Sequence, residues 1–262
     1  MQHQSRDTVV TVSPPTFDRT DFARLDAALG ARHAPFNRDW LMARFAEGLQ
    51  IRLLKPPHAG LVLFQPGKLA WRPILGAGHA LVVHDLRVAP GPMARDSATR
   101  LWDVVEAFAR YYGLSAVLAL IGAGAGSGPE SGLVSGDLAP GRGWQTLDHG
   151  PGATRLVGRI LQGPVAVPRL PTDWTLRAAS LGPGVVVQTT GESAALEARA
   201  CDITAHLAML GHAARHDRLG DAAAAQARAV RPGAAYSVVI NGQIAGGAGL
   251  SVDAITSMLN AS

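Results

Sequence analysis

Apolar positions in the first part of the chain follow two different spacings. A spacing of three and four residues predicts helices over 36–49 and 97–113, and Gly113 ends the second of them. Short continuous apolar runs predict strands over 79–88 and 115–122. A strand, a helix and another strand in direct succession are typical of a βαβ unit.

Two further strand signals flank this unit. The segments IRLLKP and GLVLFQPG, before it, predict a hairpin-like pair of strands. The segment RLVGRILQG at 155–163 predicts a last strand. Between them, residues 122–143 are rich in Gly, Ser and Pro, which favours a flexible loop or a poorly formed helix. Because this stretch lacks Gly-Lys-Ser/Thr, it is not expected to be a P-loop.

A proline-rich stretch separates this part from the rest. GPVAVPRLPTD at 163–173 holds three prolines, which oppose regular structure. After it the pattern predicts a short helix from Trp174, a strand over 184–191, a helix over 192–211 and a short helix over 221–230. A hairpin over 235–249 turns at Asn241–Gly242, and a helix over 252–260 follows. We therefore expect domains at 1–163 and 175–262, joined by a linker at 164–174.

Composition narrows the class of protein. Apolar residues make up 47% and charged residues 17%, which is enough for a globular core. The net charge of +4 comes from dispersed Arg residues without a run of like charges, so we expect solvated faces and no nucleic-acid partner. The N-terminus MQHQSRDTVVTVS lacks the apolar run of a signal peptide, and no stretch is long and apolar enough to span a membrane. These features predict a soluble, cytoplasmic protein.

Cysteine and histidine offer little metal chemistry. Cys201 has no partner for an internal disulfide, and its position within a predicted helix favours a buried, inert thiol. His212 and His216 would share a face only if their stretch were helical, and with His206 they match no metal motif. No metal is expected.

The stretch HDLRVAPGPMARDSATRLW at 84–102 has the form of an anion-binding loop. It runs from a strand end through a Pro/Gly turn into a helix, where free backbone N–H groups attract a phosphate. Asp96 opposes an anion there, since a carboxylate about 5 Å from a pyrophosphate costs on the order of a few kcal/mol. The alternative role for Asp96 is the N-cap of the helix.

Several segments together carry a family resemblance. They are FNRDWLMARFAEGLQIRLL, GLVLFQPGKLAWRPI, the strand–loop–helix at 79–113 and RGWQTL, followed by LPTDW and AAYSVVINGQI in the second part. Over roughly residues 35–260 the chain resembles bacterial proteins that join a GNAT N-acetyltransferase domain to a YoaP-like, thioredoxin-like domain. The resemblance implies an α/β (α+β) fold, with a GNAT-like mixed sheet, helices on both of its faces and then a small βα-ββα domain.

The same resemblance implies a binding site for acetyl-CoA or another acyl-CoA. The family loop reads Arg/Gln-x-x-Gly-x-Gly/Ala, and MARDSA aligns with it; Met93 and Asp96 depart from the pattern, and Arg95 and Arg100 could offset the charge of Asp96. Strand residues 82–86 would pair with the pantetheine arm. The implied cofactor-binding residues are Leu86, Val88, Met93, Ala94, Arg95, Asp96, Ser97 and Ala98.

The implied catalytic residues are His84 and Asp85, at the end of the same strand. His84 suits a general base acting through water, and strand alternation predicts that the two side chains point to opposite faces. An equally open alternative is a histidine that bonds only to backbone. The family's general acid, a Tyr after the 115–121 strand, has no counterpart in 122–143. Trp71 and Arg72 are candidates to line a substrate face, with core packing as the alternative for Trp71.

The second part also departs from its relatives. Where they carry Cys-Pro after the first strand, at a helix start, either Glu192 or Ser193 stands in place of the Cys in this chain, so thiol–disulfide exchange is not expected. The leading hypothesis is a GNAT-type transfer of an acyl group from acyl-CoA to a small amine. The alternative is a non-catalytic relative, a pseudoenzyme that binds a small molecule or a protein partner. A homodimer is compatible with either.

Overall fold

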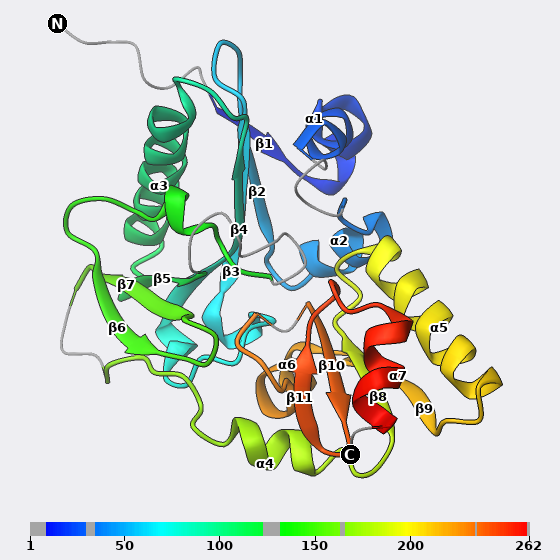
Figure 1. Cartoon of the computed structure of the whole chain (residues 1–262). Coiled ribbons are helices and arrows are strands. Elements are labelled where there is room, and N and C mark those ends of the chain that lie inside the picture. The colour runs from blue at the N-terminus through cyan, green and yellow to red at the C-terminus, as the bar shows by residue number, and fades with distance from the viewer. Residues whose placement is uncertain (1–8, 30–34, 123–131, 163–165, 234, 261–262) are drawn as a thin grey trace, which may run out of the picture.

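The chain forms a mixed α/β structure with two sheets, as the sequence predicted (Figure 1). The computed structural model describes residues 9–29, 35–122, 132–162, 166–233 and 235–260. The larger sheet takes its strands from residues 9–160 and the smaller one from residues 185–246. No helix among the described residues is long and apolar enough to cross a membrane.

The larger sheet has seven strands in the order β1-β2-β3-β4-β5-β7-β6. Neighbouring strands are antiparallel except β4 and β5, which are parallel. A parallel pair needs a crossover, and the helix between β4 and β5 supplies it. The strands are β1 (Val9–Val12), β2 (Gln50–Leu54), β3 (Gly60–Pro66), β4 (Ala80–Val88), β5 (Ala116–Ile121), β6 (Gln145–His149) and β7 (Arg155–Ile160).

Helices cover both faces of this sheet (Figure 1). The crossover helix α3 (Ala94–Tyr111) packs its apolar stripe on one face. The opposite face carries η1 (Pro14–Arg19), α1 (Phe22–Leu29) and α2 (Arg38–Phe45). Asn37 caps α2, and its side chain accepts a hydrogen bond from the N–H of Asp39. Single-turn helices η2 (Gly67–Leu69), η3 (Ala77–His79) and η6 (Gly136–Leu138) lie in connections.

The smaller sheet has four strands in the order β11-β10-β8-β9. β8 and β9 are parallel and joined by a helix, whereas β10 runs antiparallel to β8 and turns into β11 at Asn241–Gly242. Both turn residues have positive φ, as this tight hairpin turn requires. The elements are α4 (Trp174–Ala179), β8 (Val185–Thr189), α5 (Ala194–Met209), β9 (Ala214–Arg218), α6 (Ala222–Arg228), β10 (Tyr236–Ile240), β11 (Gln243–Gly246) and α7 (Val252–Asn260).

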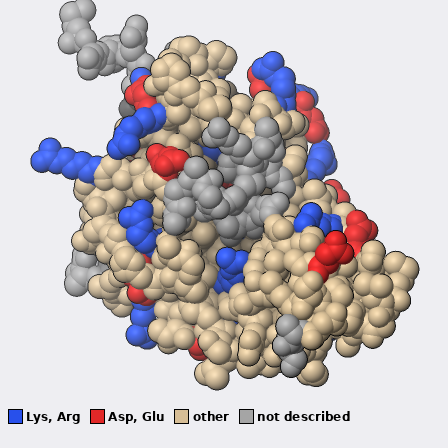
Figure 2. Space-filling view, viewed as in Figure 1, with Lys and Arg blue, Asp and Glu red and all other residues tan. Residues whose placement is uncertain are grey.

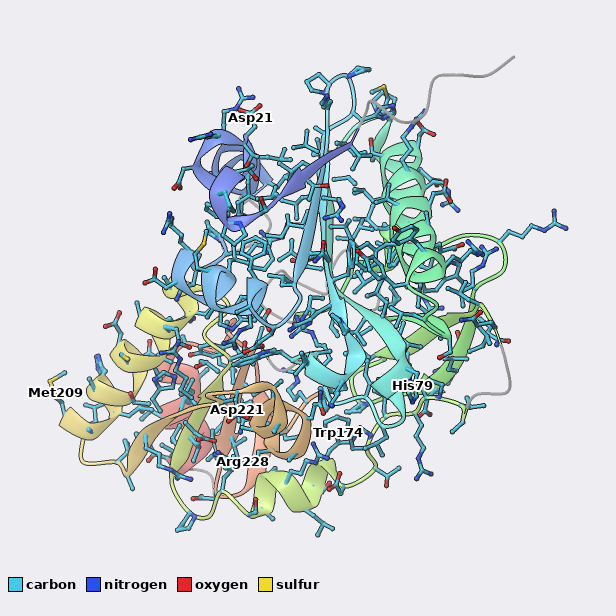
Figure 3. The ribbon with its side chains drawn as sticks, turned by 180° about the vertical axis from the view of Figure 1, so that it is seen from behind. Asp21, His79, Trp174, Met209, Asp221 and Arg228 are labelled. Carbon is cyan, nitrogen blue, oxygen red and sulfur yellow. The ribbon has the colours of Figure 1, made fainter. Side chains whose placement is uncertain are left out.

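The two sheets are joined through α6, which runs between the labelled Asp221 and Arg228 in Figure 3. Ala222 and Ala225 of this helix belong to one buried cluster with Ile51 and Trp71 of the larger part. The side-chain amide of Gln226 donates to the carbonyl oxygen of Ala70 at 2.8 Å. The described residues on either side of the expected linker therefore share core packing.

One expectation about local structure was wrong, and several elements were not predicted. Cys201 is exposed on α5 rather than buried. His216 lies in strand β9, so it does not share a helical face with His212. Strands β1, β6 and β9 and helix α1 were not predicted. Of the glycine-rich stretch 122–143, residues 123–131 lie outside the described residues, and 136–138 form the single turn η6.

Candidate functional site

The larger sheet opens between its two parallel strands. β4 and β5 are paired from Ala80↔Ala116 to Val83↔Ala119, and the pairing ends there although β4 continues to Val88. On its other side β4 stays paired with β3 up to Val88. The two parallel strands therefore diverge after Val83, which leaves one edge of β4 beside an opening in the sheet.

A β-bulge lies at the start of this opening. Leu63 of β3 is opposite Asp85 and Phe64 is opposite Val83, so His84 is the extra residue of β4. A bulge breaks the alternation of side chains. Both His84 and Asp85 consequently point to the face covered by α1 and α2, and the expectation that they point to opposite faces was wrong.

His84 is completely enclosed. Its ring packs edge-on against Trp40 of α2, with 6.4 Å between the ring centroids. Neither ring nitrogen has a hydrogen-bond partner among the described residues. Burial, followed by the positive charges of Arg72 and Arg44, lowers the pKa of His84 well below its usual 6.5. The imidazole is therefore neutral at pH 7.

Asp85 belongs to a buried charge network. Nε of Arg87 donates to Oδ2 of Asp85 at 2.8 Å, and the same guanidinium donates to Oδ1 of Asp26 in α1 at 2.6 Å. The guanidinium also lies 4.1 Å from the ring centre of Phe36. Burial raises the pKa of Asp26, while Arg87 opposes that shift. Two carboxylates thus share one guanidinium beneath the β4 bulge.

Trp71 and Arg72 are both buried rather than part of an open substrate face. Trp71 packs in the core against Trp40, so core packing describes its position. Arg72 donates to both carboxylate oxygens of Glu192, at 2.5 and 3.1 Å, and to the backbone oxygen of His84 at 3.3 Å. Arg72 therefore links the β4 bulge to the segment that begins α5.

On the β5 side of the opening, the backbone of β5 is hydrogen-bonded to another segment of the same chain, at Val134. The N–H of Val134 donates to the oxygen of Leu120, and the N–H of Gly122 donates to the oxygen of Val134, each at 2.9 Å. The adjacent Gly132 has φ +65°, and a Cβ there would lie 2.4 Å from the oxygen of Gly233. Only glycine fits this passage. Within the described residues, no strand pairs with the opposite, β4 side of the opening beyond Val83.

The start of α3 differs from the expectation. The helix begins at Ala94 with Met93 in the N-cap position, so Asp96 is its third residue and not its cap. The carboxylate of Asp96 accepts from Nε of Arg100 at 2.9 Å and lies 3.5 Å from Nε2 of His58. His58 also contacts the hydroxyl of Ser97 at 3.1 Å. Asp96 is exposed, and its negative charge lies within the first turn.

The remaining candidates for cofactor binding lie either on β4 or at the start of α3. On β4, Leu86 is buried under α3 and Val88 is half-buried at the end of the strand.

At the start of α3, Met93 and Arg95 are exposed, whereas Ser97 and Ala98 are buried. The N–H of Ser97 donates to the oxygen of Met93. The N–H of Ala94 donates to the oxygen of Gly91. Among described residues, this leaves the N–H groups of Arg95 and Asp96 as first-turn donors without an acceptor.

A small pocket lies where the β4 bulge meets the start of α5. Its volume is about 10 Å³, and it is lined by Phe36, Asp85, Arg87, Gly132, Glu192, Ser193, Leu196 and Ala235. Some lining residues come from the part of the chain that forms the larger sheet, and the others come from the part that forms the smaller sheet. Sequence reasoning named Glu192 and Ser193 only as replacements for a missing cysteine. No local signal showed that they would face Asp85.

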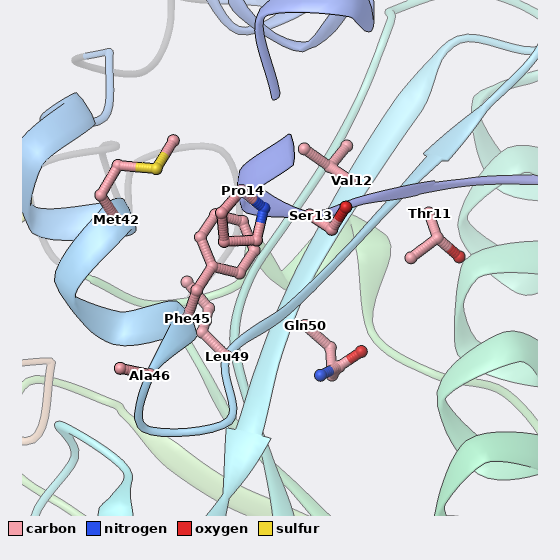
Figure 4. Close-up of a pocket in the computed structure, with 9 residues that line it drawn as sticks. All are labelled: Thr11, Val12, Ser13, Pro14, Met42, Phe45, Ala46, Leu49 and Gln50. Carbon is pink, nitrogen blue, oxygen red and sulfur yellow. The ribbon is translucent and has the colours of Figure 1, made fainter. Parts of the chain in front are cut away.

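A larger cavity carries no comparable chemistry. It occupies about 370 Å³ between the end of β1 and helix α2, with Phe45, Pro14 and Met42 around it (Figure 4). None of its lining residues is titratable. Within the described residues, no group of three potential metal ligands occurs. On the face shown in Figure 2, Lys and Arg are dispersed and several adjoin Asp or Glu.

Comparison with known proteins gives weak matches only. No family model and no curated protein matches the chain. The ribosomal-protein-alanine N-acetyltransferase from Brucella melitensis is similar with a TM-score of 0.40 and 18% identity, over 58% of this chain and 99% of that one. A protein named provisionally as a phosphinothricin N-acetyltransferase gives 0.40 and 14%, over 60% and 99%. Similarity this low does not indicate what this chain does.

Proposed function

We propose that the chain is an acyl-CoA-dependent N-acyltransferase of GNAT type that acts on a small amine. The observation that carries this proposal is the divergence of β4 from β5 after Val83, with a bulge at His84. An unpaired strand edge presents backbone N–H and C=O groups, which suit the amide-containing pantetheine arm of an acyl-CoA. Because Val134 uses the β5 side, the arm would lie along the β4 side, at Leu86 and Val88.

The diphosphate of the same ligand would lie at the start of α3. This helix follows β4 after a short connection, and its first-turn N–H groups at Arg95 and Asp96 can donate to an anion. The exposed Arg95 adds positive charge, whereas Asp96 subtracts from it. The residues present therefore fit a phosphate group, with Asp96 as the feature that weakens its binding.

The chemistry assigned to the site is direct acyl transfer. A bound acyl-CoA supplies a thioester whose carbonyl carbon the amine attacks, with loss of the thiol. Among the two catalytic candidates, Asp85 lines the pocket beside the opening and can accept the amine proton. His84 is neutral and sealed beneath the bulge, so its proposed part is to support that turn of β4 rather than to exchange protons with solvent.

The second part of the chain is proposed to be a YoaP-like, thioredoxin-like domain without redox chemistry. Its order β8-α5-β9-α6-β10-β11-α7, with strand order β11-β10-β8-β9, supports that assignment. In this assignment Glu192 or Ser193 stands in place of the family cysteine, and the carboxylate of Glu192 is committed to Arg72. A carboxylate cannot exchange disulfides, so this domain shapes the site.

A second candidate function is a non-catalytic relative that binds a small molecule or a protein. Two observations favour it: Asp96 lies in the first turn of α3, and Val134 already occupies part of the opening. Binding of the acyl donor separates the two candidates, because a relative that has lost acyl transfer through its loop has no affinity for CoA.

The test is calorimetric titration of the purified protein with acetyl-CoA and with CoA, at low and moderate salt. We expect micromolar affinity that weakens with salt and drops in Arg95→Ala. Arg199→Ala, an exposed arginine on α5, is the matched control and should change nothing. Absence of binding at millimolar ligand would remove the acyltransferase proposal and leave the second candidate.

A further inference from the structure

His58 lies against the first turn of α3, in the connection between β2 and β3. This connection and the start of α3 are at the same end of the larger sheet (Figure 1). Nδ1 of His58 lies 3.1 Å from the hydroxyl of Ser97, and Nε2 lies 3.5 Å from Oδ2 of Asp96. We propose that protonated His58 offsets the charge of Asp96 and thereby strengthens the binding of a diphosphate at this helix start.

The imidazole of His58 is fixed beside the carboxylate that it would offset. The residue is buried, and both of its ring nitrogens face α3. The Asp96 oxygen nearest to His58 also accepts from Nε of Arg100 at 2.9 Å. One carboxylate oxygen thus lies between an arginine and a histidine. A change in the charge of His58 therefore acts directly on Asp96.

Both protonation states of His58 find partners in this position. In the neutral ring, Nε2–H is directed at Asp96 while Nδ1 accepts from the hydroxyl of Ser97. In the imidazolium both nitrogens donate, and the same hydroxyl accepts instead. His84 differs, because neither of its buried nitrogens has a partner among the described residues. The environment of His58 accommodates a change of charge, whereas that of His84 opposes it.

The charged groups around His58 show what its protonation changes. Those on the first turns of α3, and on the connection that holds His58, are Asp96, Arg95, Arg100 and Lys55. Arg87, near the end of the adjoining strand β4, is bound to carboxylates on the opposite face of the sheet. Asp96 is therefore the one carboxylate in this described group, and protonation of His58 places a second cation against it.

Offsetting Asp96 matters because its carboxylate belongs to the first turn of α3. The N–H groups of Arg95 and Asp96 attract an anion to this turn, whereas the carboxylate repels it. At an effective dielectric constant between those of bulk water and a protein surface, one unit charge about 7 Å from an anion changes its affinity by roughly three- to tenfold. The charge state of His58 is thus expected to set the affinity of the site.

This inference rests on the proposed function, since it concerns the diphosphate of the acyl donor. Histidine is the side chain whose charge ordinarily changes between pH 5 and 8. An anion that binds the protonated form more tightly should bind better at pH 6 than at pH 8. By linkage, its binding should also draw protons onto the chain.

The experiment uses dephospho-CoA as the probe and calorimetric titration of the full chain as the readout. CoA itself is unsuitable because a phosphate monoester changes charge near pH 6, whereas the diphosphate of dephospho-CoA keeps its charge from pH 6 to pH 8. We expect an affinity about three- to tenfold higher at pH 6 than at pH 8. Titration near pH 7 in two buffers of different ionisation enthalpy should show net proton uptake.

The variant His58→Gln keeps a polar side chain and removes the titrating charge. Its affinity should be equal at pH 6 and pH 8, close to that of the unaltered chain at pH 8, without proton uptake. The matched control is His149→Gln, at an exposed histidine of β6, which should keep both the pH dependence and the proton uptake. Circular dichroism at both pH values should confirm that each chain is folded.

The outcomes separate this inference from the proposed function. Absence of dephospho-CoA binding throughout pH 6 to 8 removes the acyltransferase proposal and this inference with it. Equal affinity at the two pH values without proton uptake keeps the acyl-donor site and overturns the part of His58. A pH dependence that persists in His58→Gln, or that His149→Gln abolishes, also overturns it. The measurements on the unaltered chain keep the inference falsifiable if His58→Gln fails to fold.

Discussion

Arg72 and Glu192, 120 positions apart in the chain, form a buried ion pair with two hydrogen bonds across the junction of the two sheets. The guanidinium also holds the backbone oxygen of His84, and the backbone oxygen of Glu192 accepts from the N–H of Asn37 at 2.7 Å. Through side-chain and backbone hydrogen bonds, these two residues thus connect the β4 bulge, the start of α2 and the start of α5. The geometry of the candidate site depends on this pair.

Replacing Arg72 by Met should destabilise the chain strongly. The substitution leaves the Glu192 carboxylate buried without its partner, and breaking one side of a buried ion pair costs roughly 3–5 kcal/mol. The double variant Arg72→Met with Glu192→Met should recover much of that loss. Urea unfolding measures both. Arg24→Met is the control, since the Arg24–Asp21 pair is exposed and should cost at most about 1 kcal/mol.

His84 should make the fold sensitive to acid. Because burial lowers its pKa in the folded state, the unfolded chain binds a proton on His84 below about pH 6.5 while the folded chain does not. Stability contributed by His84 is constant above pH 6.5 and falls as the pH drops below it, by up to about 1.4 kcal/mol per pH unit. Unfolding free energies measured from pH 7.5 to 5 should show this.

The comparison variant for that experiment is His84→Gln, which should flatten the fall between pH 6.5 and 5. His79→Gln, at an exposed histidine, should follow the unaltered chain. If His84→Gln and the unaltered chain lose stability in parallel, the imidazole is not kept neutral by the fold.

Local patterns predicted the elements that local forces determine. The Asn241–Gly242 turn and the apolar stripe of α3 depend on residues close in sequence, and the structure contains both. Strand β9 reads ARHDR, and its polar residues hide a strand that is defined by pairing with β8. Edge strands of this kind have no alternation that a single sequence reveals.

The candidate site depends on relationships that no local pattern contains. The bulge at His84 exists only in the register between β3 and β4, so strand alternation wrongly predicted that His84 and Asp85 point to opposite faces. The start of α3 lies three residues before the predicted one, which moved Asp96 from a cap into the first turn. Glu192 belongs to the site because it pairs with Arg72. The two residues are 120 positions apart, so no local sequence pattern predicts the pair. Tertiary pairing decides each of these cases.

Asp96 should weaken the affinity for CoA by its charge alone. Asp96→Asn keeps the side-chain shape and removes the carboxylate beside the first-turn N–H groups of α3. Since the side chain is exposed, screening reduces the effect, and we expect a gain of about three- to tenfold at low salt that shrinks at high salt. Calorimetry measures it. Asp103→Asn, on the same helix but farther from its start, should give no gain, and an equal gain there would contradict the local explanation.

Cys201 should react with a thiol reagent in the folded protein. Its side chain is exposed on α5, and its sulfur lies 3.7 Å from Nδ1 of His216, so no unfolding is needed to reach it. Titration with a chromogenic aromatic disulfide under native conditions should release one equivalent of the reporter thiolate, and Cys201→Ser should release none. A reaction that starts only in denaturant would show that the thiol is buried and that this face of α5 is covered.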